Sequence, residues 1–107
     1  MNCIVVVTTV HTREEARRIG SALVERRLAA CAQIWEIESF YTWDGALRNE
    51  TEFRLELKTT DARYGAVERA IRELHSYALP AIHAQPLAQV YPPYAAWVER
   101  GSDGVPL

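Results

Sequence analysis

Residues 31–58 constrain the fold more than any other part of this chain, because they read as one long β-hairpin. Residues 31–43 are rich in β-branched and aromatic side chains, which favour extended structure. Asp44 and Gly45 then give a strong signal for a tight hairpin turn. Residues 52–58 alternate strictly between apolar and charged side chains, so one face can enter a core. The chain is therefore expected to fold around an antiparallel sheet.

Before the hairpin, the sequence predicts a strand and then a helix. Residues 3–9 form a short apolar run of mainly β-branched side chains, as in a strand buried within a sheet. Thr12 and Glu15 fit a capping box, in which Thr12 accepts from the amide of residue 15 and Glu15 reaches back to the amide of residue 12. Apolar residues at helical spacing then extend a helix over about residues 12–27.

After the hairpin, the sequence predicts a helix, a strand and a short terminal helix. Asp61 can cap the first of these helices, which carries an apolar stripe as far as residue 74. Residues 81–87 read as a strand, and Pro92 starts a short helix because proline fits the first helical turn. Residues 101–104 contain two glycines and are expected to fray.

These elements give the order βαββαβ with a C-terminal helix, and the 107 residues fit one domain over residues 1–107. This order is the split βαβ arrangement of ferredoxin-like folds, in which one antiparallel sheet carries both main helices on one face. We therefore expect an α+β domain of ferredoxin-like fold, with a long hairpin between its second and third strands.

In such a sheet the strand over residues 31–43 would lie at an edge, although it is apolar on both faces. Trp35 and Trp43 would share one face, and Ile34 and Phe40 the other. A long apolar edge strand invites pairing with another chain, so we expect a closed homo-oligomer. The alternative is that the aromatic C-terminal helix covers this edge within one chain.

The composition excludes several classes of function. Twelve basic and 14 acidic residues give a net charge of −2, which offers no electrostatic basis for binding nucleic acid or an anionic membrane. The longest apolar runs have about five residues, whereas a membrane-spanning helix needs roughly 20. No signal peptide is recognised, and two cysteines without a disulfide framework indicate reduced thiols and a cytoplasmic location.

Individual candidate residues each allow two interpretations. Cys31 is either a small core side chain or a metal-binding thiolate. Lys58 is either half of an exposed ion pair or a cation that holds a ligand. His75 and His83 are too far apart for a helical pair, although imidazole suits copper or zinc. No nucleophile and base can both be named, so we do not expect an enzyme.

Five segments together resemble the CutA family of divalent-cation tolerance proteins, over nearly the whole chain. They read LAAC at 28–31, SFYTWDG at 39–45, ETE at 50–52, LKTT at 57–60 and HSYALP at 75–80. The resemblance implies a ferredoxin-like subunit, a tight homotrimer and clefts between subunits. It also implies binding of copper or another divalent cation, because the family is associated with metal tolerance.

The resemblance further implies roles for particular residues, with Cys31 and His75 as metal ligands. In two positions the chain departs from the family pattern, because Ser76 and Ala81 replace a proline and a glutamate that the family usually carries. The lost carboxylate removes a possible hard ligand from the cleft. The residues expected to line the ligand-binding cleft are Tyr41, Trp43, Glu50, Glu52, Lys58, His75, Tyr77 and Trp97.

Two functional hypotheses follow. The first is a trimeric protein of the metal-stress response that binds copper or a related divalent ion. The alternative is a sensor with the architecture of trimeric P-II signalling proteins, which would bind a small anionic metabolite in the cleft between subunits. In that sensor, Lys58 and His75 would hold the anion, while Tyr41 and Trp43 would stack on its apolar part.

Overall fold

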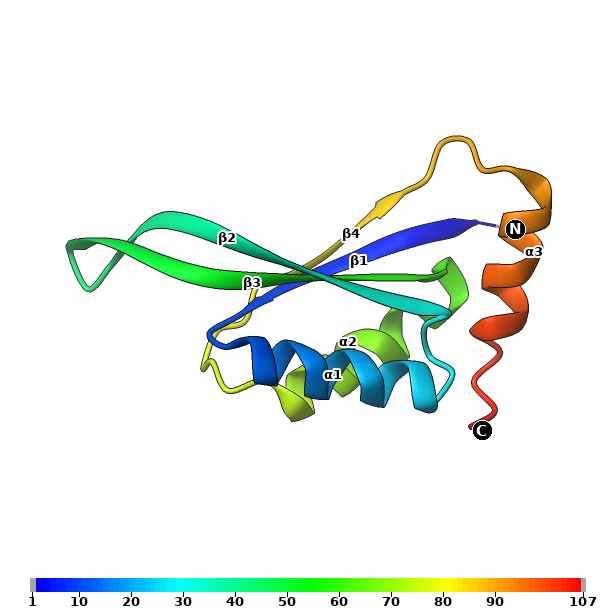
Figure 1. Cartoon of the computed structure of the whole chain (residues 1–107), viewed down its shortest axis with the longest axis horizontal. Helices are drawn as coiled ribbons and strands as arrows, with labels where there is room; N and C mark the ends of the chain where they lie inside the picture. The colour runs from blue at the N-terminus through cyan, green and yellow to red at the C-terminus, as the bar shows by residue number, and fades with distance from the viewer. Residues whose placement is uncertain (1, 107) are drawn as a thin grey trace.

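The computed structural model describes residues 2–106 as one sheet with helices packed against it (Figure 1). The strands are β1 (Cys3–Val10), β2 (Cys31–Trp43), β3 (Ala46–Thr60) and β4 (Ile82–Pro86). The helices are α1 (Arg13–Glu25), α2 (Tyr64–Leu74) and α3 (Pro92–Gly101), with a single 3-10 turn (Asp61–Arg63) directly before α2. The predicted α+β class and the predicted order of elements along the chain are confirmed.

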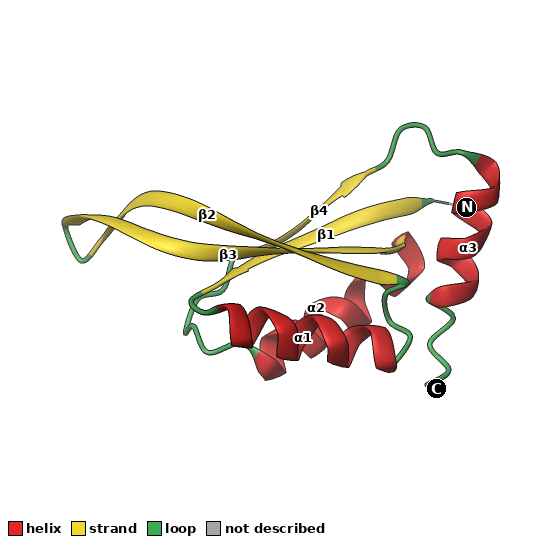
Figure 2. Ribbon diagram, viewed as in Figure 1, coloured by secondary structure: helices red, strands yellow, loops and turns green. Residues whose placement is uncertain are grey.

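The strands lie in the order β2-β3-β1-β4, and every neighbouring pair is antiparallel. β2 pairs with β3 along its whole length, from Cys31 opposite Lys58 to Trp43 opposite Ala46. α1 and α2 lie on one face of the sheet, as predicted, while α3 lies beside its end near the N-terminus (Figure 2). β2 and β4 therefore form the two edges of this sheet.

The hydrophobic core lies between the sheet and the layer formed by α1 and α2. Alternate residues of the central strands enter it, because successive side chains of a strand point to opposite faces. The helices contribute stripes at helical spacing, as in the sequence pattern. No helix within residues 2–106 is long and apolar enough to cross a membrane. The fully buried core side chains include Val6, Val10, Ile19, Leu23, Leu55, Leu57, Val67 and Ile71.

The predicted caps of the two main helices are confirmed only in part. Thr12 accepts a hydrogen bond from the amide of Glu15 at 3.1 Å, as predicted. The carboxylate of Glu15 does not turn back to Thr12, because it binds Ser76 after the end of α2. Asp61 begins the 3-10 turn and provides no side-chain cap for α2, so that prediction is wrong.

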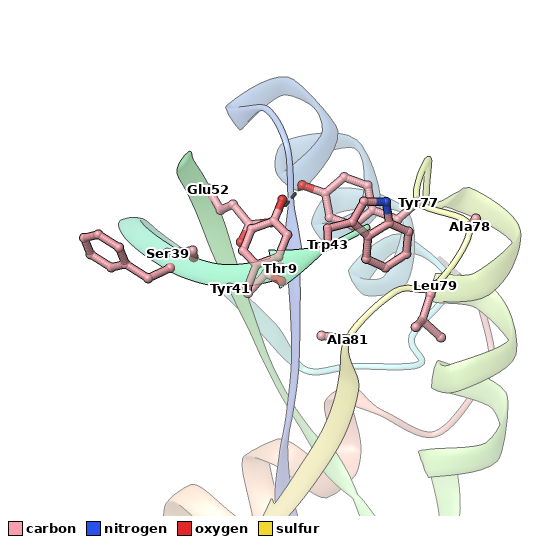
Figure 3. A pocket seen from close by; sticks show the side chains of 10 residues that line it. Thr9, Ser39, Tyr41, Trp43, Glu52, Tyr77, Ala78, Leu79 and Ala81 are labelled. Atoms are coloured by element: carbon pink, nitrogen blue, oxygen red, sulfur yellow. Dashed lines mark hydrogen bonds between the residues drawn. The ribbon is translucent and has the colours of Figure 1, made fainter. Parts of the chain in front are cut away.

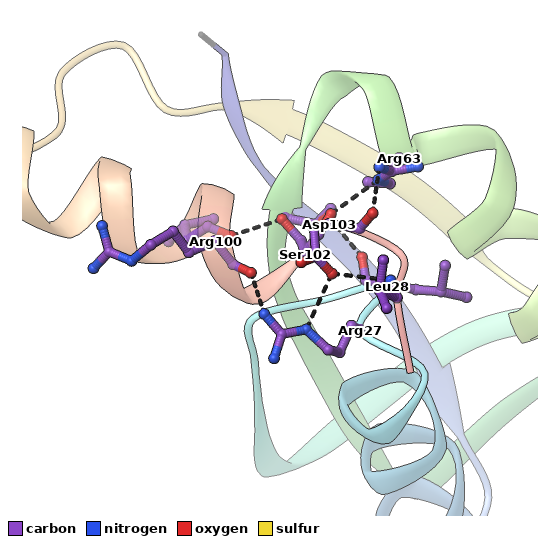
Figure 4. A network of polar contacts seen from close by, with 9 residues as sticks. Arg27, Leu28, Arg63, Arg100, Ser102 and Asp103 are labelled. Atoms are coloured by element: carbon purple, nitrogen blue, oxygen red, sulfur yellow. Dashed lines mark hydrogen bonds and ion pairs between the residues drawn. The ribbon is translucent and has the colours of Figure 1, made fainter. Parts of the chain in front are cut away.

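Residues 101–104 are held in place by polar contacts, so the prediction that they fray is wrong (Figure 4). Ser102 is only 2% exposed. The guanidinium of Arg63 donates to the carbonyls of Ser102 and Asp103, at 2.9 and 2.6 Å. Arg27 donates to Oδ1 of Asp103 at 3.1 Å. Two arginines from distant parts of the chain thus fix the segment after α3.

The β2–β3 hairpin projects beyond the rest of the molecule (Figure 1). Along β2, Trp35, Phe40 and Trp43 remain 46%, 65% and 49% exposed. α3 packs mainly against β3 and β1, and the hydroxyl of its Tyr94 lies 3.8 Å from the thiol of Cys31 at the start of β2. The Cα radius of gyration is 14.3 Å, against about 13 Å for a compact domain of this length. The alternative that the C-terminal helix covers this edge is therefore wrong.

Candidate functional site

A pocket of about 470 Å³ lies beside the hairpin, where the chain that follows α2 passes close to it (Figure 3). Tyr41 and Trp43 reach it from β2, since residues two apart in a strand point to the same face. Tyr77 reaches the same pocket from the loop after α2. The remaining lining residues are Thr9, Ser39, Phe40, Glu52, Ala78, Leu79 and Ala81.

Two tyrosines hold two carboxylates at this pocket. The hydroxyl of Tyr77 donates to Oε2 of Glu52 at 2.7 Å, and the hydroxyl of Tyr41 donates to Oε1 of Glu50. Burial, and then the bond to Glu52, raises the pKa of Tyr77 far above its ordinary value. The bond to Glu50 is the main cause of the raised pKa of Tyr41. Both hydroxyls therefore stay protonated at neutral pH and act as donors.

Negative charge dominates this pocket. Glu52 is 7% exposed, and within residues 2–106 it forms no ion pair with a basic side chain. None of the residues that line the pocket is Lys, Arg or His. Lys58, expected to hold an anion, donates instead to Oε1 of Gln33 at 2.8 Å. The pocket offers an anionic metabolite no basic partner, so the anion-sensor hypothesis is not favoured.

A buried network at the end of α2 positions Tyr77. Nε2 of His75 lies 2.8 Å from the carbonyl of Thr9, and the amide of Tyr77 donates to Nδ1 of His75 at 3.1 Å. We therefore assign His75 as the neutral tautomer whose Nε2–H donates to Thr9. Glu15 accepts from the amide and the hydroxyl of Ser76, each at 2.8 Å. The side chain of His75 is fully buried with both ring nitrogens engaged, and it supports the loop.

A second cluster surrounds Cys31 at the start of β2. Its thiol is partly exposed and lies 3.8 Å from the hydroxyl of Tyr94. The ring of Tyr94 stacks on Trp97, with ring centroids 5.7 Å apart. Burial, and then the contact with Cys31, raises the pKa of Tyr94, so this hydroxyl stays protonated beside the thiol. Lys58 is the cross-strand partner of Cys31, which puts both side chains on one face.

The structure does not bring Cys31 and His75 together. Cys31 lies opposite Lys58, whereas His75 binds Thr9, which pairs with Arg54 four residues away along β3. Four residues of strand span about 13 Å, while each ligand of a zinc ion lies within about 2.3 Å of it. The expected Cys31–His75 metal site is therefore not formed within one chain. Nor do the described residues contain a cluster of three or more His, Cys, Asp or Glu side chains that could hold a metal ion.

The predicted cleft residues thus divide among three places. Tyr41, Trp43, Glu52 and Tyr77 line the pocket, and Glu50 is tied to it through the hydroxyl of Tyr41. The other predicted residues lie elsewhere: Lys58 and Trp97 in the Cys31 cluster, and His75 behind the loop that carries Tyr77.

Some residues of the site could not be recognised from the sequence. Leu79 and Ala78 line the pocket, but small or aliphatic side chains carry no functional signal. Glu15 supports the loop through a contact with a residue 61 positions away. Ala81 was marked only by its departure from the family pattern, and it lines the pocket directly.

Comparisons with known proteins agree with this architecture. The family described as "CutA1 divalent ion tolerance protein" matches residues 4–101. The divalent-cation tolerance protein CutA of Archaeoglobus fulgidus is 35% identical over 92 residues, which cover 86% of this chain and 90% of that protein. The one from Thermus thermophilus is 37% identical over 99 residues, which cover 92% of this chain and 96% of that protein.

Solved structures of two of these proteins superpose closely on this chain. The structure of the Archaeoglobus fulgidus protein, described as a periplasmic divalent cation tolerance protein, superposes with a TM-score of 0.92 at 32% identity. It covers 94% of this chain and 99% of the other. The Thermus thermophilus structure superposes with a TM-score of 0.89 at 37% identity, and it covers 94% of this chain and 98% of the other.

Proposed function

Because this chain belongs to the CutA1 divalent ion tolerance family, we propose that it binds copper or another divalent cation and works as a homotrimer in the response to metal stress. The function proposed is binding, without a chemical step. The names of the relatives support the class of ligand. The partly exposed thiol of Cys31 is the observation that supports a binding group on this chain.

Cys31 has the chemistry of a copper or zinc ligand. Thiolates are soft ligands that select these metals over calcium and magnesium. Cys31 is reachable from solvent, whereas Cys3 is buried in β1. A single thiol is too few for a stable site, because structural zinc sites use four protein ligands. In this proposal, ligands from neighbouring subunits complete the coordination.

The shape of the chain supports an assembly of several copies. β2 is an edge strand of 13 residues, and its outer backbone groups have no strand partner in the described chain. The exposed side chains of Trp35 and Phe40 would be buried by a neighbour. β4 forms the opposite edge, so contacts between unlike edges of successive copies can close into a ring.

Anaerobic titration of the reduced protein with Cu(I), against a chromophoric chelator, tests the metal-binding group. We expect Cys31→Ala to weaken Cu(I) binding by at least about tenfold, since even residues that only orient metal ligands change affinity by this much. Cys3→Ala is the matched control, because it removes a buried thiol, and it should leave the affinity unchanged.

Unchanged Cu(I) affinity in Cys31→Ala would remove Cys31 from the site. His75→Gln tests the other ligand expected from the resemblance. We expect this variant to melt at a lower temperature but to bind Cu(I) as the wild type does, because both imidazole nitrogens already have partners. Weaker binding in a His75→Gln protein that is fully folded would show that His75 changes its contacts to reach the metal.

A further inference from the structure

We propose that the 470 Å³ pocket lined by Tyr41, Trp43, Tyr77 and Glu52, called the aromatic pocket below, binds a small organic cation with N–H donors. Protonated amines and amidines or guanidines on a small apolar body belong to this class. The inference goes beyond the metal-ion function and uses other residues, because Cys31 does not line this pocket. Each proposal can therefore fail without the other.

The carboxylate of Glu52 supplies the argument for positive charge. A buried carboxylate without a cationic partner is unfavourable, since its lost hydration is not replaced. Tyr77 gives Oε2 a neutral donor, which leaves Oε1 for another donor. Arg48, opposite Tyr41 in the ladder, forms no ion pair with Glu52 in the described chain. A ligand with a positively charged N–H group would supply the cationic partner that the carboxylate of Glu52 lacks.

The aromatic rings supply the second argument. A cation is attracted to the face of an aromatic ring within about 6 Å of its centroid. Tyr41 and Trp43 enter the pocket from β2, and Tyr77 enters it from the loop (Figure 3). Tyr41 and Tyr77 are held by hydrogen bonds to Glu50 and Glu52, so their rings need little reordering when a ligand binds.

The lining fits an organic cation better than a bare metal ion. A calcium ion takes about six to eight oxygen ligands, whereas Glu52 is the one carboxylate among the lining residues. Ala78, Leu79 and Ala81 make much of the remaining wall apolar. A volume of about 470 Å³ is within the usual range for small-molecule pockets, and an apolar wall with few polar groups is typical of them.

Isothermal titration calorimetry with benzylamine, benzamidine and 1,5-diaminopentane tests the proposal on the full-length protein. Each cation is paired with an uncharged analogue of similar shape: benzyl alcohol, benzamide and 1,5-pentanediol. We expect at least one cation to bind saturably with one site per chain. We expect it to bind about tenfold or more tightly than its analogue, because hydrogen bonds between charged groups are the strong ones.

Two pairs of variants locate the binding. Glu52→Gln should weaken binding of the cation about tenfold or more, while Glu56→Gln should not, because Glu56 lies on the same face of β3 but is paired with Arg54 at 3.0 Å. Trp43→Leu should weaken binding about threefold. Trp35→Leu is its control, because Trp35 is equally exposed on β2 but lies outside the pocket. Circular dichroism confirms that each variant is folded.

Three results would each overturn the proposal: no saturable binding of any of the three cations, equal binding of the uncharged analogues, or unchanged binding in folded Glu52→Gln. The first is expected if a basic side chain of a second copy occupies the aromatic pocket in the assembled protein. Should Glu52→Gln fail to fold, the comparison of Trp43→Leu with Trp35→Leu decides. None of these results affects the Cu(I) titration, so the two functions are tested separately.

Discussion

At the scale of single residues, the aromatic pocket depends on side chains that do not line it. Glu15 is almost fully buried in α1, and both of its carboxylate oxygens hold Ser76. His75 ties the same loop to β1 through the carbonyl of Thr9. Tyr77 follows Ser76 directly in the sequence, so these contacts fix its position at the pocket.

Ser76→Ala tests this support. We expect the variant to lose about 1–2 kcal/mol of unfolding free energy, because it removes a hydrogen bond from a hydroxyl to a buried carboxylate. Urea unfolding at one fixed protein concentration measures the difference. Ser21→Ala is the control, since the hydroxyl of Ser21 is exposed and bonds only a carbonyl of its own helix. Equal unfolding midpoints for the two variants would contradict the role given to Ser76.

The raised pKa of Tyr77 makes a second prediction at this scale. Below the ordinary tyrosine pKa of 10.0, Tyr77 is protonated in the folded and the unfolded protein alike. Above it, the unfolded chain loses the proton first, so the stabilisation from Tyr77 declines as the pH rises. The melting temperature of the wild type should therefore fall more between about pH 9 and pH 11 than that of Tyr77→Phe. If the melting temperatures of the two proteins changed in parallel with pH, this result would contradict the burial of Tyr77 and its bond to Glu52.

The sequence could predict the members of this site better than their contacts. Resemblance to a family identified Tyr41, Trp43 and Tyr77, because it transfers residue types position by position. It carries no distances, and so it joined Cys31 to His75, which the sheet keeps apart. Likewise a capping box describes only neighbours in sequence, whereas the carboxylate it contains is used by a residue far along the chain.

At the scale of elements, the periodicity of apolar residues was sufficient to predict a strand or helix where that element has one buried face. The strict alternation after the turn predicted β3, and the stripe of apolar residues predicted α2. The segment after α3 has no such pattern, because its position is fixed by Arg27 and Arg63 from elsewhere in the fold. Composition alone therefore suggested a frayed tail where the structure has an anchored one.

Two glycines test how closely the elements pack. A Cβ at Gly101, at the end of α3, would lie 2.8 Å from the Cβ of Ala30 and 3.1 Å from its Cα. We expect Gly101→Ala to lower the unfolding free energy by about 1–3 kcal/mol, because backbone must move. A Cβ at Gly65 in α2 would meet only the end of Arg69 at 3.6 Å. Gly65→Ala should be neutral or stabilising by up to about 1 kcal/mol in the same urea experiment. A Gly101→Ala variant that is more stable than Gly65→Ala would contradict the close approach of α3 to residue 30.

At the scale of the whole molecule, one chain leaves much of its hairpin exposed. The principal extents are 45 × 28 × 21 Å, and the longest follows the hairpin (Figure 1). Trp35 and Phe40 on β2 lie along an unpaired edge. Apolar surface of this kind favours association. The proposed trimer would bury it and would supply the ligands that Cys31 lacks within one chain.

Sedimentation equilibrium of the reduced protein at micromolar concentration tests the assembly on which this account depends. We expect a single species with three times the 12.1 kDa mass of one chain. A species of 12.1 kDa at that concentration would contradict the homotrimer, and with it a Cys31 metal site completed by neighbouring subunits.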